Sequence, residues 1–210
     1  MKQVLAELKL SDLYTNCLYI SKLFDLYCGI RNISDDDLKN SLLGEQRFVC
    51  YQDFVAFNML SDDIEFWVKL SVDETLKIDP ILWKMVKSNR TYRTERALVL
   101  PFQVFPEDRM HIFGGEDDLV FSFTLPPGHY QLLFQDRFFT RKEIEASPNN
   151  DCEDIEYDLS KCDYIDDFCQ ITFIPIEDKI EPKFIIYEGS MEAKKFPPIV
   201  IHERKISEQS

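Results

Sequence analysis

Two short segments near the middle of the chain constrain its fold most strongly, because large apolar residues occupy alternate positions in both. In residues 119–125 every second residue is leucine or phenylalanine, and residues 130–134 repeat the alternation with tyrosine, leucine and phenylalanine. A period of two places such residues on one face of a β-strand. Between the segments stands Pro126-Pro127-Gly128, which favours a turn and predicts an antiparallel hairpin. We expect one core to contain Phe121, Phe123, Tyr130, Leu132 and Phe134.

Other segments extend this β pattern along the chain. Gly114-Gly115 marks a turn between an apolar segment, 110–113, and the strand at 119–125. Residues 98–105 are also strand-like, and Pro101 within them indicates a strand edge or a bulge. Further strands are predicted at residues 47–57, 64–72, 169–176, 184–187 and 198–202. The fold class predicted is mainly β: an antiparallel β-sandwich-like domain with one or two short helices.

The helical signals are weaker. Apolar residues in the segment 4–27 recur at steps of three and four, which fits a helix, but the same segment is rich in strand-forming residues. Helix and strand therefore both remain open for residues 1–30. A short helix is predicted over 38–43, and a second is predicted after Asp79-Pro80, with a buried side formed by Ile81, Leu82, Met85 and Val86.

The length and composition fit a single folded domain spanning residues 1–210. Hydrophobic residues make up 45% of the 210 residues and include 17 phenylalanines, which is enough for a substantial core. No apolar run approaches the roughly 20 residues that a membrane helix needs. The first residues lack the pattern of a signal peptide, so a cytoplasmic protein is expected. The last residues, 205–210, are expected to be frayed.

Six cysteines are present without regular spacing, and we expect free thiols rather than a disulfide framework. A zinc site at Cys152, Cys162 and Cys169 would lack paired-ligand spacing. The acidic run at 149–158 lacks the glycine that a calcium-binding EF-hand loop requires. No metal and no cofactor are therefore expected.

Charge is the strongest functional signal in the composition. The net charge is −14, from 38 acidic against 24 basic residues, which disfavours nucleic acid and anionic membranes and favours a basic protein partner. Acids are dense in a segment at about 141–168, which we expect to be an acidic loop or insertion. The candidate partner-binding residues are Glu116, Asp117, Asp118, Asp151, Glu153, Asp154, Glu156 and Asp158.

The sequence gives little support for catalysis. It contains no GxSxG, GxxxxGK[ST], GxGxxG or HExxH pattern. Its three histidines, His111, His129 and His202, have no spacing that signals a metal site or a general base. We therefore expect a protein that is not an enzyme. Two alternatives stay open: a hydrolase that uses scattered carboxylates, and a structural subunit of an assembly.

The central block also resembles a known family. The order ERALVLPFQV, MHIF and LVFSFTLPPGHYQLLFQ is similar to that of the competence protein ComJ family, the DNA-entry nuclease inhibitors. The resemblance covers roughly residues 64–135, and the acidic C-terminal third departs from it. It implies a small β-sandwich-like protein that binds and inhibits a DNase. The residues that carry it are Arg96, Leu98, Pro101, Phe102, Ile112, Phe121, Leu125, Pro126, Gly128, Tyr130, Gln131 and Leu132.

Overall fold

Strands form all the regular secondary structure in the described part of the chain. The computed structural model describes residues 2–11, 17–22, 47–51, 54–58, 65–78, 81–84, 91–94, 96–114, 118–137, 167–186, 199 and 201. The strands are β1 (Gln3–Ser11), β2 (Cys17–Ser21), β3 (Phe48–Cys50), β4 (Phe54–Asn58), β5 (Glu65–Val72), β6 (Ile81–Lys84), β7 (Thr91–Arg93), β8 (Arg96–Val104), β9 (Met110–Gly114), β10 (Asp118–Phe123), β11 (Gly128–Arg137), β12 (Asp167–Ile176) and β13 (Lys183–Ile186). The predicted mainly β fold is confirmed.

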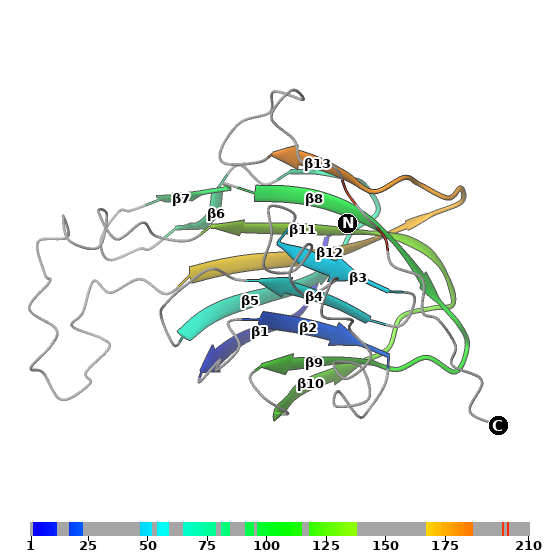
Figure 1. Cartoon of the computed structure of the whole chain (residues 1–210), viewed down its shortest axis with the longest axis horizontal. Helices are drawn as coiled ribbons and strands as arrows, with labels where there is room; N and C mark the ends of the chain where they lie inside the picture. Colours follow the sequence, from blue (N-terminus) through cyan, green and yellow to red (C-terminus); the bar gives the residue numbers. More distant parts are fainter. Residues whose placement is uncertain are drawn as a thin grey trace, which may run out of the picture.

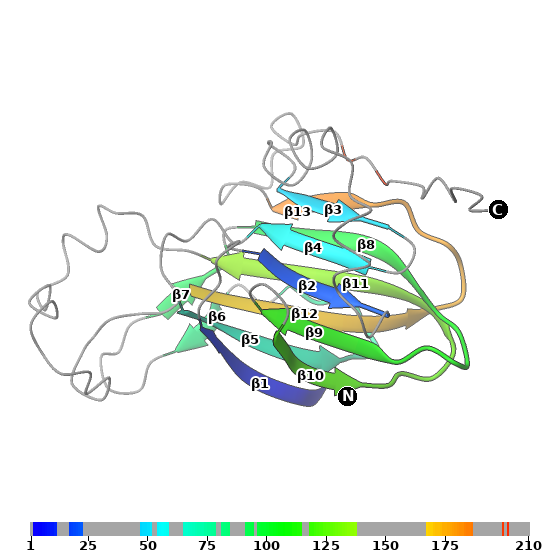
Figure 2. The same ribbon diagram turned by 60° about the horizontal axis from the view of Figure 1, so that its bottom comes forward.

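Two sheets lie face to face and form a sandwich (Figures 1 and 2). Sheet A has the strand order β1-β5-β12-β11-β8-β13, and sheet B has the order β10-β9-β2-β4-β3. Neighbouring strands are antiparallel throughout, except that β12 runs parallel to β5. A parallel pair requires a long connection between its strands, and in sequence β5 and β12 are separated by almost 100 residues.

The inward faces of the two sheets share one hydrophobic core. Sheet A contributes side chains such as Leu132, Phe134 and Phe173, and sheet B contributes Ile20 and Phe57. The rings of Phe57 and Phe134 stack across the sandwich with their centroids 3.9 Å apart. The predicted sharing of one core is confirmed: Phe123, Tyr130, Leu132 and Phe134 are buried in it, and Phe121 packs against it half-buried.

The predicted hairpin between the two alternating segments is wrong. β10 pairs with β9 in sheet B, whereas β11 pairs with β8 and β12 in sheet A. The segment Pro126-Pro127-Gly128 therefore carries the chain from one sheet to the other. Two prolines suit a segment that crosses between sheets, because proline has no N–H to donate to a neighbouring strand. The segment is held by the Tyr130 hydroxyl, which donates to the Pro126 carbonyl at 2.8 Å. The strands on either side of the turn predicted at Gly114-Gly115, β9 and β10, pair antiparallel.

Two other local predictions are wrong, and one question that the sequence left open is answered. The helix expected after Asp79-Pro80 is a strand, β6, which pairs with β7; proline is also compatible with the start of a strand. The single strand expected over 47–57 is a hairpin of β3 and β4, closed where the Tyr51 amide donates to the Phe54 carbonyl. The ambiguous N-terminal segment contains two strands, β1 and β2. The helix predicted at 38–43 lies outside the described residues.

Pro101 illustrates how a proline fits an interior strand. β8 lies between β11 and β13, but β13 pairs only with the stretch from Ala97 to Val99. Pro101 lies beyond this pairing, and β11 is its only partner among the described strands, where it stands opposite Gln131. The strand is therefore locally an edge at Pro101, as the sequence predicted.

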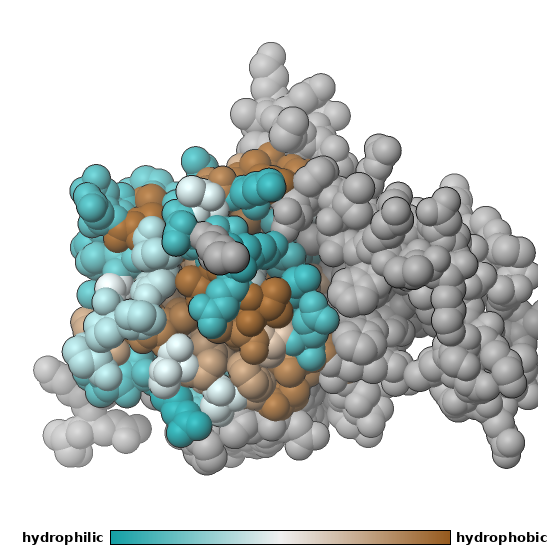
Figure 3. All heavy atoms as spheres, turned by 180° about the vertical axis from the view of Figure 1, so that it is seen from behind, coloured by the Kyte–Doolittle hydropathy of each residue, from teal (hydrophilic) through white to brown (hydrophobic). Residues whose placement is uncertain are grey.

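The outer face of sheet A carries a second layer. β6 contacts β11 and β12, and the Gln135 amide donates to the Thr94 hydroxyl at 3.0 Å, just after β7. A small apolar cluster of Val99, Leu133 and Ile174 is buried on the same face beneath Ile78, Ile180 and Ile185. Seen from behind, apolar side chains (brown) lie among polar ones (teal) in the described part of the molecule (Figure 3).

A buried lysine fixes the end of the sandwich where the chain passes from β8 to β9. The Nζ of Lys22 lies 3.2 Å from Oδ2 of Asp108 and 5.2 Å and 5.3 Å from the ring centroids of Phe102 and Phe105. The same Asp108 carboxylate accepts a hydrogen bond from the Phe105 amide at 2.9 Å. Lys22 follows β2 of sheet B and Phe102 belongs to β8 of sheet A, so this contact joins the two sheets.

The side chains of two cysteines, Cys50 and Cys169, are described, and both are buried. Cys50 and Cys169 carry thiols and form no disulfide bond, as expected. The side chains of the other four cysteines lie outside the described part of the structure. No helix long and apolar enough to cross a membrane occurs among the described residues.

We expect Phe123→Ala to lower the free energy of unfolding by about 3–5 kcal/mol, because it removes a buried ring and leaves a cavity beside Phe173. Urea denaturation would measure the loss. Val120→Ala is the matched control, since Val120 in the same strand is 38% exposed; its effect should stay within about 0.5 kcal/mol. Equal effects of the two variants would contradict the placement of Phe123 in the core.

His111 should lower the free energy of unfolding in mild acid. Its ring Nδ1 lies 2.8 Å from the Ser122 hydroxyl, and burial, followed by the charge of Arg109, lowers its pKa. The unfolded chain then binds this proton more tightly than the folded chain, so stability is present above the unfolded pKa of about 6.5 and is lost as the pH falls through the folded pKa. Between pH 7 and pH 5, the unfolding free energy of His111→Gln should therefore fall less than that of the wild type. Identical slopes would contradict this assignment.

Candidate functional site

The connections 115–117 and 138–166, which contain candidate acids, both start and finish at one end of the sandwich. We call it the Arg96 end. In sheet A, Arg96 stands opposite Asp136, and the next pairs are Arg137 with Phe168 and Asp167 with Phe66. In sheet B, the matching strand ends pair Cys17 with Asn58 and Asp118 with Gly114. These ends lie on the left in Figure 1.

A buried ion pair lies just inside this end. The Nε of Arg96 donates to Oδ1 of Asp136 at 3.0 Å, and its Nη2 contacts Oδ2 of the same carboxylate. Both side chains are almost fully buried. The alternation of the strands explains the position, because Arg96 and Asp136 are in phase with the inward-facing Leu98 and Phe134.

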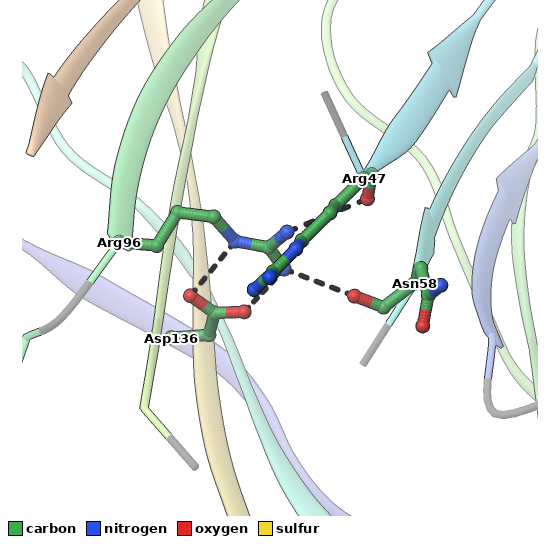
Figure 4. Close-up of polar contacts among 4 residues, drawn as sticks. All are labelled: Arg47, Asn58, Arg96 and Asp136. Atoms are coloured by element: carbon green, nitrogen blue, oxygen red, sulfur yellow. Dashed lines mark hydrogen bonds and ion pairs between the residues drawn. The ribbon is translucent and has the colours of Figure 1, made fainter. Parts of the chain in front are cut away.

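The same guanidinium reaches across to sheet B. Its Nη2 donates to the Asn58 carbonyl at 3.1 Å and its Nη1 donates to the Arg47 carbonyl at 3.4 Å (Figure 4). Its Cζ also lies 5.1 Å from the centroid of the Phe134 ring, within the range of a cation–π contact. Arg96 thus joins both sheets through one planar group with several donors.

Arg47 completes the cluster. Its backbone has a φ of 59°, a left-handed conformation that non-glycine residues rarely adopt. Its main-chain carbonyl accepts hydrogen bonds from the Arg96 guanidinium and from the main-chain N–H of Asn58. Its side chain points toward the Asp136 carboxylate (Figure 4). Burial raises the pKa of Asp136, and the charges of Arg96 and Arg47 oppose the rise.

This cluster is built to hold the sheets together rather than to react. The described hydrogen bonds of the Arg96 guanidinium all go to Asp136 and to two main-chain carbonyls. The thiol of Cys50, elsewhere in the core, is equally unsuited to attack a substrate, because burial raises its pKa to about 12 despite the charge of Lys22. No group of three metal-ligating side chains occurs among the described residues.

The structure describes one of the eight predicted partner-binding residues. Asp118 begins β10 at the Arg96 end, with its backbone opposite Gly114. The other seven lie outside the described residues: Glu116, Asp117, Asp151, Glu153, Asp154, Glu156 and Asp158. The ends of their connections are nevertheless defined. The chain leaves sheet B at Gly114 and returns at Asp118, and it leaves sheet A at Arg137 and returns at Asp167. Both connections therefore start and finish at the Arg96 end.

The pairing of Arg96 with Asp136 is not among the features predicted from the sequence. A signal for the pair was present, since each is a charged residue in phase with the apolar, inward-facing positions of its strand. An in-phase charge within an apolar row has to find a partner when it is buried. Opposite charges on two predicted strands could therefore have been matched.

Comparisons with known proteins returned structural neighbours only. No protein-family model matches the sequence, and no curated protein matches it. Among solved structures, the chain is similar to ComJ from Bacillus subtilis, described as the inhibitor of the DNA degrading activity of NucA, with 14% identity and a TM-score of 0.47. It is also similar to the protein named crocagin biosynthetic gene J, with 17% identity and a TM-score of 0.43. Each match covers 84% of this chain and 99% of the other chain. ComJ represents the family that the central block resembles.

Asp136→Asn should destabilise the fold by about 3–5 kcal/mol, because it leaves the buried Arg96 without its counter-charge. Replacing both partners by apolar residues, Arg96→Met with Asp136→Leu, removes the unpaired charge, so the double variant should be more stable than Asp136→Asn alone. Urea denaturation of the three proteins would measure both differences. A loss below about 1 kcal/mol for the single variant would show that the pair is not buried as described.

Proposed function

We propose that this chain is a non-catalytic, acidic protein-binding module that inhibits a nuclease or a toxin. The observation that supports this most strongly is the arrangement of charge. The chain carries a net charge of −14, and both connections that contain the candidate acids, 115–117 and 138–166, start and finish at the Arg96 end. An end of the sandwich at which both acid-rich connections start and finish suits a basic partner.

The physical logic is electrostatic complementarity. A nuclease needs a basic cleft to bind phosphates, and an acidic protein can be steered into such a cleft from solution. The resemblance of the central block to the DNA-entry nuclease inhibitors points to the same class of partner. The proposed contact residues are the eight acids Glu116, Asp117, Asp118, Asp151, Glu153, Asp154, Glu156 and Asp158.

The first test uses a basic protein that the purified chain captures from a native lysate at low salt and releases at high salt. Neutralising Glu116, Asp117 and Asp118 together, to Gln, Asn and Asn, should slow association by roughly three- to tenfold, since charges around an interface act mainly on the rate of encounter. Dissociation should change less. The association rate of the wild type should itself fall as salt is added, because screening acts over about 8–10 Å at moderate ionic strength.

The matched control neutralises three acids at the opposite end of sheet A: Glu177→Gln, Asp178→Asn and Glu181→Gln. All three are exposed and the change in net charge is the same. An equal slowing by both triple variants would show that net charge alone matters and would contradict a binding site at the Arg96 end. A captured DNase should also be inhibited at near-equimolar ratio by the wild type. Tight DNA binding by the chain itself at ordinary salt would defeat the proposal.

A further inference from the structure

β1 is an edge strand with an unusually open apolar row. It pairs with β5, and no other described strand pairs with it. Ala6 and Leu8 are in phase with the buried row of sheet A and pack against the core, yet both are only half-buried, while their neighbours Val68 and Leu70 are at most 1% exposed. An edge strand of nine residues without proline is a ready template for pairing with another strand.

The two margins of the sandwich differ in how they are closed. At one margin, β3 and β13 are bridged by the rings of Phe48 and Phe184, whose centroids are 6.0 Å apart. At the other margin lie β1 and β10 (Figure 2), where Val4 is 46% and Val120 is 38% exposed. Of the exposed large apolar side chains among the described residues, Val4 and Val120 lie on the two strands of this margin, and the others are Leu76 and Ile201.

The sequence of β1 complements itself. If two β1 strands run antiparallel with Leu8 opposite Leu8 of the second copy, Glu7 of each copy stands opposite Lys9 of the other, and Ala6 stands opposite Leu10. Two opposite-charge pairs and a continuous apolar row result from one two-fold axis, as a symmetric interface requires. A lone lysine on an edge usually discourages pairing, but here Glu7 of the second copy would stand opposite Lys9. Glu7 also lies 3.2 Å from Lys69 of its own β5, so its carboxylate would be shared between two lysines.

We propose that β1 is a self-association site, where a second copy of this chain extends sheet A across a two-fold axis centred on Leu8. The bulge between Val4 and Ala6 lies before the paired stretch, which runs from Ala6 to Leu10 in each copy. Ser11 lies at the Arg96 end, so the antiparallel arrangement points the two Arg96 ends in opposite directions. Self-association and binding of another protein at that end therefore do not compete, and this inference does not rest on the proposed function.

Sedimentation velocity over a range of concentrations tests the proposal. The wild type should be a dimer with twice the mass of one chain. Lys9→Glu and Glu7→Lys, each alone, replace both opposite-charge pairs by like-charge pairs and should raise the dimer dissociation constant by about tenfold or more. An equimolar mixture of the two variants restores opposite charges at every pair and should dimerise again. Lys77→Glu and Glu177→Lys are the matched controls at exposed positions and should dimerise like the wild type.

A cross-link provides a second, independent measurement. Leu8→Cys places two thiols directly opposite each other across the axis, within reach of a disulfide, and should give a covalent dimer on mild oxidation. Ala6→Cys is the control, because the register offsets its two copies by four residues, or about 13 Å along the strands. A wild type that stays monomeric at all concentrations would overturn the proposal. So would a dimer that neither charge reversal weakens, a mixture that fails to dimerise, or equal cross-linking by both cysteine variants.

Discussion

Burial of the Arg96 guanidinium is the constraint on which the arrangement of the two sheets depends. A charge removed from water has to find an opposite charge and acceptors for its remaining donors. Arg96 finds the charge in Asp136 of its own sheet and the acceptors in the Arg47 and Asn58 carbonyls of the other sheet. The left-handed backbone at Arg47 is consistent with this demand, since it places a carbonyl where Arg96 and the Asn58 amide both reach it. Sheets that pack through apolar side chains alone can slide, whereas directional hydrogen bonds fix their relative position.

The opposite end of the sandwich uses the same principle with different residues. Lys22 reaches Asp108 and lies against two aromatic rings, so a charged group again joins sheet B to sheet A. Between these anchors the core is filled by aliphatic side chains together with aromatic rings, including the stacked pair of Phe57 and Phe134. A scaffold fixed at both ends can carry long connections without losing its shape, which is why interaction residues in such folds are commonly found on connections rather than on strands.

The sequence predicted which face a residue occupies better than which strand lies beside it. Alternation at Phe121, Phe123, Tyr130 and Phe134 identified the core correctly, because a period of two determines the side of a sheet. It could not show that β10 and β11 belong to different sheets, since both arrangements bury the same residues. β6 was mistaken for a helix because four apolar and basic residues after a proline carry no decisive period. The only sequence signal for the pairing of Arg96 with Asp136 is a charged residue within an otherwise apolar row. The acids proposed for binding have no such signal and follow from composition alone.

The ionic interactions of this molecule therefore differ in burial, and salt should weaken them to different extents. Arg96 and Asp136 are shielded from the solvent, so dissolved ions screen their attraction far less than that of exposed charges. Acids that are exposed to solvent act through water, and their interaction with a partner decays within about a Debye length. Ion pairs at an edge, such as that between Glu7 and Lys69 at 3.2 Å, fall between these limits, because both side chains are partly exposed. An increase in ionic strength should accordingly weaken encounters with a charged partner first and edge pairing next, while the sandwich itself stays folded.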